Sequence, residues 1–134
     1  MPALPYSTVM QGHVRDAADV RALFDKLADA TLECCGFAYL DQQWRLLGTR
    51  HTPPGHADGA AVPLRDVVRD VLDLEASAVV MAHNHPAGDP TPSEADLVVT
   101  RRLLSALEAL DVRLVDHVVL AGARWASMRG MGLL

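Results

Sequence analysis

Residues 78–110 constrain the fold more than any other segment, because they read as a strand, a loop and a helix in direct succession. The run AVVMA at 78–82 is short, apolar and partly β-branched, which is typical of a strand buried on both faces. A stretch rich in Pro, Gly and Asp follows, and apolar residues then recur at helical spacing from Pro92 to about Leu110. A buried strand that leads into a long helix predicts a sheet covered by helices.

In the rest of the chain, segments with helical spacing of apolar residues again occur beside segments typical of strands. Helices are expected over 16–31 and 63–75, and strands over 34–40, 44–50, 112–122 and 124–128. Pro63 is allowed at the first position of its helix, and the polar turn DQQ joins the first two strands in a hairpin. Since no repeat or linker separates these elements, we predict a single α/β domain over residues 1–134, a mixed sheet flanked by helices.

Composition limits the classes of function. The chain is 50% hydrophobic and 4% aromatic, so its core should consist mainly of Val, Leu and Ala. The formal net charge of −5 and the scattered arginines argue against a nucleic-acid-binding face. No stretch approaches the ~18 apolar residues that a membrane span needs, and the first residues lack the pattern of a secretion signal. We therefore expect a protein that does not associate with membranes.

The two cysteines are neighbours, Cys34 and Cys35. Successive side chains on a strand point to opposite faces, so this pair is not suited to an ordinary disulfide or to clasping zinc. We expect free thiols in a reducing compartment, and cytoplasmic localisation.

His83 and His85 are the first candidates for a metal site. On an extended segment, residues i and i+2 point to the same side, so these two imidazoles can converge on one ion while Asn84 points away. A catalytic zinc site needs a third ligand, commonly a carboxylate, and keeps one position open for water. Asp96 supplies that carboxylate, so the sequence predicts a zinc site formed by His83, His85 and Asp96.

The start of the following helix can be read in two ways. In the first, Thr91 is the N-cap of a capping box with Glu94, so neither Ser93 nor Asp96 is needed as a cap. Asp96 then shares the sheet-facing side of the helix with Leu103, Leu107 and Leu110. A carboxylate on that side must be paired or bound to a metal. In the second, Ser93 is the N-cap, Asp96 is the third helical residue and the histidines belong to an ordinary loop. We favour the first.

The combined order His-x-His, seven residues, Ser, two residues, Asp resembles the motif of the JAMM metallohydrolases, also called MPN-plus or JAB proteins. The segments AHNHPAGDPTPSEADLVVTRRLL and LVDHVVLAG are similar to the bacterial RadC-like branch. The similarity covers about Leu32 to Ser127 and implies a single MPN/JAB domain with a cytidine-deaminase-like architecture.

This resemblance assigns roles to individual residues. It implies that His83, His85 and Asp96 bind Zn²⁺ and that Ser93 helps to hold the tetrahedral intermediate. The segment ECCGFAYLD resembles the family's first strand, which makes Glu33 the residue that handles the proton. Without the resemblance, Glu33 has no fixed spacing to the motif, and Glu94, Asp89 and Asp66 are equal candidates. The implied activity is that of a zinc metallopeptidase or isopeptidase that hydrolyses an amide bond in a peptide or protein substrate.

Three hypotheses of function remain open at this stage: a zinc-dependent hydrolase, a DNA-associated RadC-like protein or nuclease, and a non-catalytic interaction domain. RadC-like proteins usually carry helix-hairpin-helix elements ahead of this domain. We expect that region to be absent here, which weakens a role in DNA repair. A site of two histidines and one carboxylate also suits non-haem iron oxygenases. The signatures of HNH nucleases and zinc deaminases are not matched.

Two further groups of residues bear on the site. Asp116 and His117 are neighbours on an expected strand, so at most one can point to the metal, and we expect a hydrogen bond rather than ligation. The segment 51–60 contains His51 and His56 among Pro and Gly residues. We expect a mobile surface loop that gates access to the site.

Overall fold

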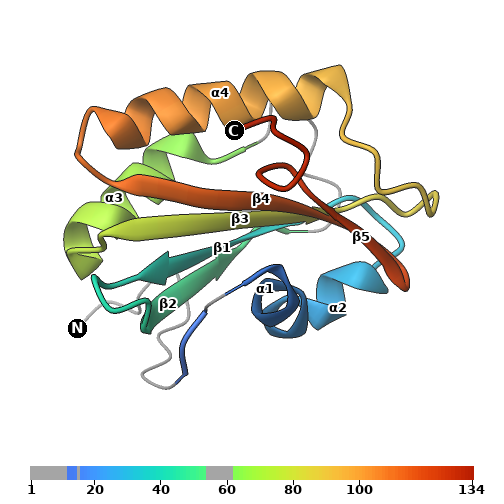
Figure 1. Ribbon diagram of the computed structural model, residues 1–134, viewed down its shortest axis with the longest axis horizontal. Coiled ribbons are helices and arrows are strands. Elements are labelled where there is room, and N and C mark those ends of the chain that lie inside the picture. Colours follow the sequence, from blue (N-terminus) through green and yellow to red (C-terminus); the bar gives the residue numbers. More distant parts are fainter. Residues whose placement is uncertain (1–11, 15, 54–61) are drawn as a thin grey trace.

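The computed structural model describes residues 12–14, 16–53 and 62–134 and shows a mixed α/β fold (Figure 1). In chain order the elements are α1 (Ala17–Leu23), α2 (Asp25–Ala28), β1 (Cys35–Leu40), β2 (Leu46–His51), α3 (Leu64–Leu74), β3 (Ala78–Asn84), α4 (Glu94–Glu108), β4 (Arg113–Ala121) and β5 (Arg124–Ser127). The strands form one sheet in the order β2-β1-β3-β4-β5. Only β3 and β4 pair in parallel, and α4 makes the crossover between them. The predicted mixed sheet flanked by helices is confirmed.

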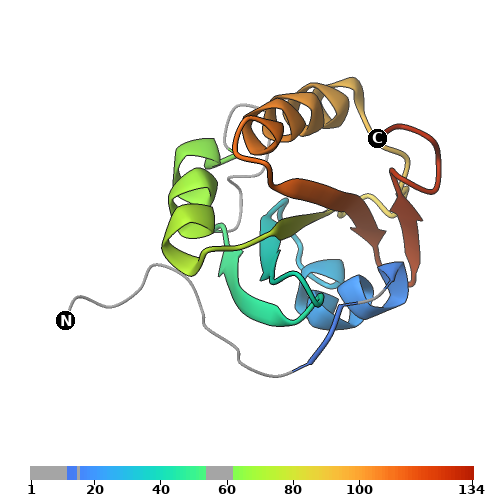
Figure 2. The same ribbon diagram turned by 60° about the vertical axis from the view of Figure 1, so that its left-hand side comes forward.

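Helices cover both faces of the sheet. Figures 1 and 2 show α3 and α4 on one face and α1 and α2 on the other. The core under α3 and α4 includes Phe37, Tyr39, Val67, Val71, Val79, Met81, Leu103, Leu107 and Leu114. The core under α1 and α2 includes Val20, Phe24, Leu27, Ala38, Leu40, Val80, Ala82, Val118 and Leu120. The central strands β1 and β3 are buried along their whole length, which is why their sequences are continuous apolar runs.

The single helix expected over 16–31 is wrong, because two short helices occupy its place. Phe24 separates them with non-helical backbone angles of φ −108° and ψ 28°. Its ring is buried against the sheet over Gly36, where an added Cβ would clash with the ring. The break lets both Phe24 and Leu27 face the sheet. The apolar residues keep helical spacing across it, so the sequence pattern does not predict the break.

The β1–β2 hairpin is confirmed, with strands that begin slightly later than expected. Asp41 organises the turn, since its Oδ1 accepts hydrogen bonds from the backbone amides of Gln43 and Arg45. Trp44 takes the left-handed conformation at φ 64°, a rare conformation for a large side chain.

The predicted start of α4 is wrong, and the capping register of the alternative, with Ser93 as N-cap, is correct. Ser93, not Thr91, is the N-cap: its hydroxyl accepts from the amide of Asp96, and the carboxylate of Asp96 accepts from the amide of Ser93. The reciprocal pair forms a capping box. Leu103 and Leu107 face the core as predicted, whereas Leu110 lies beyond the helix and is partly exposed. At α3, Pro63 is the N-cap rather than the first helical residue.

A buried charged cluster fixes α3 to the sheet. The fully buried carboxylate of Asp70 on α3 accepts hydrogen bonds from the Tyr39 hydroxyl at 2.5 Å and from Nη2 of Arg50 at 2.8 Å. Nε of Arg50 donates to the same carboxylate. Burial and the neighbouring Asp70 carboxylate raise the pKa of Tyr39, so the phenol stays protonated and remains a donor.

None of the helices in the described part of the chain combines the length and the apolarity needed to cross a membrane. His51 ends β2, with an exposed side chain. His56 and most of the expected gating loop lie outside the described residues.

Candidate metal centre

The candidate centre lies at the carboxyl end of β3, between β1 and β4. Asn84 is the last residue of the strand and His83 precedes it, and both are buried. His85 follows directly and stays in line, since its amide donates to the carbonyl of Leu120 on β4 at 2.8 Å. The backbone is therefore extended through all three residues, so the two imidazoles lie on one side and the amide of Asn84 on the other, as predicted.

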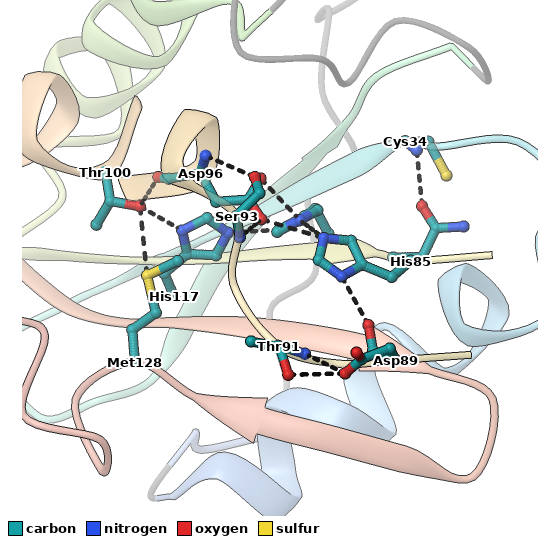
Figure 3. Close-up of polar contacts among 11 residues, drawn as sticks. Cys34, His85, Asp89, Thr91, Ser93, Asp96, Thr100, His117 and Met128 are labelled. Atoms are coloured by element: carbon teal, nitrogen blue, oxygen red, sulfur yellow. Dashed lines mark hydrogen bonds and ion pairs between the residues drawn. The ribbon is translucent and has the colours of Figure 1, made fainter. Parts of the chain in front are cut away.

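His83, His85 and Asp96 come together. Their potential ligand atoms all lie within 4.8 Å of one another. Nε2 of His83 is 2.8 Å from Nε2 of His85 and 3.2 Å from Oδ1 of Asp96, and Nε2 of His85 is 3.1 Å from Oδ2 of Asp96 (Figure 3). The side chain of His83 is 3% exposed, and those of His85 and Asp96 are each 14% exposed. The three groups therefore form a largely buried cluster with one accessible side.

The first turn of α4 places Asp96. Oδ2 of Asp96 accepts from the Ser93 amide at 2.8 Å while the same carboxylate faces both histidines. The capping register with Ser93 as N-cap therefore directs the Asp96 carboxylate at the histidines.

A chain of hydrogen bonds fixes the orientation of His83. Its Nδ1 lies 2.6 Å from Nε2 of His117, and Nδ1 of His117 lies 2.6 Å from Oγ1 of Thr100 (Figure 3). The Thr100 hydroxyl donates to the backbone carbonyl of Asp96 at 2.7 Å. Since this contact uses the only hydroxyl hydrogen, His117 must donate to Thr100 and accept from Nδ1 of His83. Burial lowers the pKa of His117 well below its ordinary value, which agrees with a neutral ring.

His85 is oriented in the same way by a loop residue. Its Nδ1 lies 2.8 Å from the backbone carbonyl of Asp89, which can only accept, so this nitrogen carries the hydrogen. Asp89 is itself held by the amide and hydroxyl of Thr91, which both donate to its Oδ1. The lone pair of His85 is therefore left on Nε2, the atom that faces Asp96.

Electrostatics couples the carboxylate to both rings. Burial alone would raise the pKa of Asp96, but hydrogen bonds and charge from His83 and His85, with the amide of Ser93, hold it well below its ordinary value. The same Asp96 contact raises the pKa of His85 against the opposing effect of burial. The cluster thus favours positive charge beside an ionised carboxylate.

The donor set fits a cation. With both Nδ1 atoms occupied as donors, the Nε2 lone pairs of His83 and His85 face each other and the Asp96 carboxylate. Lone pairs this close repel unless a proton or a metal ion lies between them. Two neutral imidazoles and one carboxylate form a donor set that zinc takes in catalytic sites, where a further position stays open.

Glu33 and Ser93 line the cleft that leads to this cluster. Glu33 lies in the exposed segment before β1, and the cleft, with a volume of about 330 Å³, is bounded by Glu33, His85, Pro86, Ala87, Asp89, Thr91 and Ser93. The Ser93 hydroxyl oxygen accepts from the Asp96 amide at 3.1 Å, which leaves its hydrogen available for another acceptor. The structure thus brings all five predicted site residues to one place, although Glu33 is far from the others in sequence.

Of the pair Asp116 and His117, only His117 points to the cluster. Oδ1 of Asp116 accepts from the amides of His117 and Arg129, and its other oxygen accepts from the Ser127 hydroxyl. Asp116 therefore organises the β4–β5 end rather than the metal centre. The expected hydrogen bond is present, since Nε2 of His117 lies 2.6 Å from Nδ1 of His83.

Sequence reasoning missed two residues that hold the centre. Thr100 lies one helical turn beyond Asp96, and this i, i+4 spacing is its only sequence signal. Asn84 lies between the two histidines and was predicted only to point away from the metal. Its side chain makes three hydrogen bonds to the segment that carries Glu33.

The fold and the centre define a class of protein: a mixed α/β domain with two histidines at the end of a central buried strand and a carboxylate on the helix that follows. The model of the RadC-like JAB domain family matches residues 14–133. This chain belongs to that family.

The sequence is similar to UPF0758 proteins of several bacteria. It is 44% identical over 108 residues to one from Bordetella avium, covering 81% of this chain and 48% of the relative. It is 45% identical over 94 residues to one from Vibrio cholerae, which covers 70% of this chain and 60% of the relative. It is 40% identical over 122 residues to one from Marinobacter nauticus, which covers 90% of this chain and 54% of the relative. The chain thus spans between 48% and 60% of the length of these relatives.

Proposed function

We propose that this domain is a zinc-dependent hydrolase of the JAMM type that cleaves an amide bond in a peptide or protein substrate. The observation that carries the proposal is the convergence of two imidazole lone pairs and a carboxylate beside a cleft lined by Glu33 and Ser93. His83, His85 and Asp96 would hold the ion. When bound, zinc lowers the pKa of water and polarises a carbonyl group, so both the nucleophile and the electrophile are activated at neutral pH.

The remaining residues have separate tasks in this proposal. Glu33 accepts the proton of the attacking water and passes it to the nitrogen of the leaving amine. The Ser93 hydroxyl donates to the carbonyl oxygen as negative charge develops on it. His117 and the Asp89 carbonyl hold the two imidazoles in the tautomers that leave Nε2 free for the ion.

The proposal includes the setting of this activity. The substrate is a peptide or a protein tail narrow enough to enter the open cleft. The work takes place in the cytoplasm, a compartment that agrees with two free, buried cysteines.

The first test is the metal content of the purified protein, measured by elemental mass spectrometry beside the Asp96→Asn variant. Asparagine keeps an oxygen that can accept from the Ser93 amide, so the helix cap is retained while the charged ligand is lost. We expect one zinc ion per chain in the parent protein and little in the variant. A chain that contains no zinc, or that selects iron, would refute the proposal.

The second test is hydrolysis of a peptide library by the zinc-loaded protein, with the Glu33→Gln variant as the matched control. Glu33 is not among the proposed ligands, so this variant should keep its zinc and lose cleavage. Cleavage at the parental rate by the Glu33→Gln variant would remove Glu33 from the mechanism. No cleavage across the library would favour a non-catalytic interaction domain.

A further inference from the structure

We propose that Asn84, the residue between the two ligand histidines, is a positioning residue that holds Glu33 at the metal centre. The proposal rests on the function proposed above, because it concerns the residue assigned to proton transfer. It gives Asn84 a role that the strand alone does not require.

Three hydrogen bonds from one side chain carry the proposal. Oδ1 of Asn84 accepts from the amide of Cys34 at 2.7 Å (Figure 3). Its Nδ2 donates to the carbonyl of Leu32 at 3.0 Å and to that of Ala30 at 3.2 Å. Asn84 is 1% exposed, so these bonds are shielded from water.

These bonds bracket Glu33. Its neighbours on both sides, Leu32 and Cys34, are each bound by the same amide group. The segment from Ala30 to Cys34 lies between the end of α2 and the start of β1, and backbone hydrogen bonds hold its two ends: the Ala30 amide donates to the Leu27 carbonyl at 3.2 Å, and the Asn84 amide donates to the Cys34 carbonyl at 3.3 Å. Between these ends, the Asn84 side chain adds a hydrogen bond to the amide of Cys34 and another to the carbonyl of Leu32, the two neighbours of Glu33.

The placement follows from the alternation of side chains on β3. His83 and His85 point to the side of α4, so Asn84 points to the side of α2, where the chain leads into β1. One tripeptide thus presents two ligands on one side and a clamp for the proton-transfer residue on the other. A shift of β3 would move the ligands and Glu33 together, which preserves their relative positions.

The decisive experiment compares Asn84→Ala and Asn84→Thr with the parent protein in three measurements. Threonine suits a strand and nearly preserves the volume of asparagine, so this variant should fold even if the alanine variant does not. Its single hydroxyl cannot replace the contacts to both Cys34 and Leu32. Amide hydrogen exchange should become about tenfold faster at Cys34, because a buried hydrogen bond is lost. Zinc per chain should be unchanged. For the peptide cleaved by the parent, kcat should fall on the order of 100-fold with little change in KM, as expected when a reacting group is misplaced.

A matched control separates this effect from general loosening of the sheet. Tyr39→Phe removes a buried hydrogen bond on β1, remote from the segment of Glu33, and should leave both kcat and exchange at Cys34 unchanged. Unchanged exchange at Cys34 in both Asn84 variants would overturn the proposal, and so would faster exchange with parental kcat. If the parent cleaves no peptide, the proposed function fails, and exchange at Cys34 still decides whether Asn84 holds this segment.

Discussion

Nδ1 of His83 lies 2.6 Å from Nε2 of the buried His117, and this contact determines which nitrogen of His83 is free to bind a metal. Since His117 donates its own hydrogen to Thr100, it can only accept from His83. The Thr100 hydroxyl in turn donates to the backbone carbonyl of Asp96. This relay of hydrogen bonds through His117 and Thr100 therefore connects two of the three candidate ligands, His83 and Asp96, within the core.

Replacement of His117 should weaken the centre without removing a ligand. We expect His117→Gln to lower zinc affinity by roughly 10- to 100-fold, the usual effect of losing the partner that orients a ligand histidine. Thr100→Val breaks the next link and should cause a smaller loss. Competition against a chromophoric chelator measures both affinities. Parental affinity in the His117→Gln variant would show that the relay does not orient His83.

Ser93 has two roles that substitutions can separate. Ser93→Ala removes the N-cap of α4, at a cost of about 1 kcal/mol, whereas Ser93→Gly costs only a few tenths. Both variants lack the hydroxyl, so kcat should fall by roughly 100-fold in each if the hydroxyl stabilises the developing oxyanion. Ser93→Thr keeps the hydroxyl and should keep most of the activity. Near-parental kcat in Ser93→Gly would assign Ser93 to capping alone.

The convergence of the candidate ligands His83, His85 and Asp96 could be predicted from sequence because its geometry is local. The i, i+2 relation of the histidines follows from an extended backbone, and Asp96 lies in the first turn of the next helix. The capping register could not be predicted, since Thr91 and Ser93 both satisfy the N-cap pattern. The structure selects Ser93, because in this register one carboxylate serves the cap and faces both rings.

Glu33 shows the limit of local reasoning. Its approach to the centre depends on the pairing of β1 with β3, in which Cys35 is opposite His83, and no spacing within the chain encodes that register. Only the resemblance to a known family selected it among the acidic residues. The break at Phe24 was missed for a related reason, since both halves keep helical periodicity and only packing against Gly36 separates them.

The cluster around Asp70 should determine the stability of the sheet without affecting the metal. Asp70→Ala leaves the guanidinium of Arg50 without its buried partner, and we expect the free energy of unfolding to fall by about 3 to 5 kcal/mol. Tyr39→Phe removes the hydrogen bond that the Tyr39 hydroxyl donates to Asp70 and should cost about 1 kcal/mol. Denaturant titration measures both, and zinc content should stay parental in each. Equal losses in the two variants would contradict a role for the ion pair.

Cys35 should react slowly with thiol reagents in the native protein at neutral pH. Burial raises its pKa to about 11, although the Thr52 hydroxyl partly offsets this effect, and burial raises the pKa of Cys34 as well. With a pKa of about 11, roughly one native Cys35 in a thousand is a thiolate at pH 8, against about a quarter in the unfolded chain, where the pKa is near 8.5. Because the Cys35 side chain is fully buried, labelling of the native protein also requires opening of the structure, and it should be far slower than labelling of the unfolded chain at the same pH.

The raised pKa of Cys35 also makes the free energy of unfolding depend on pH in the alkaline range. The unfolded chain loses the Cys35 proton at lower pH than the native protein, so the contribution of Cys35 is complete below the unfolded pKa and is lost as pH rises toward 11. The labelling prediction is checked in the Cys34→Ser variant, in which Cys35 is the remaining thiol and its modification is followed by mass spectrometry. A native labelling rate at pH 8 equal to that in denaturant would show that Cys35 is accessible and would contradict its position under α3 and α4 beside His83.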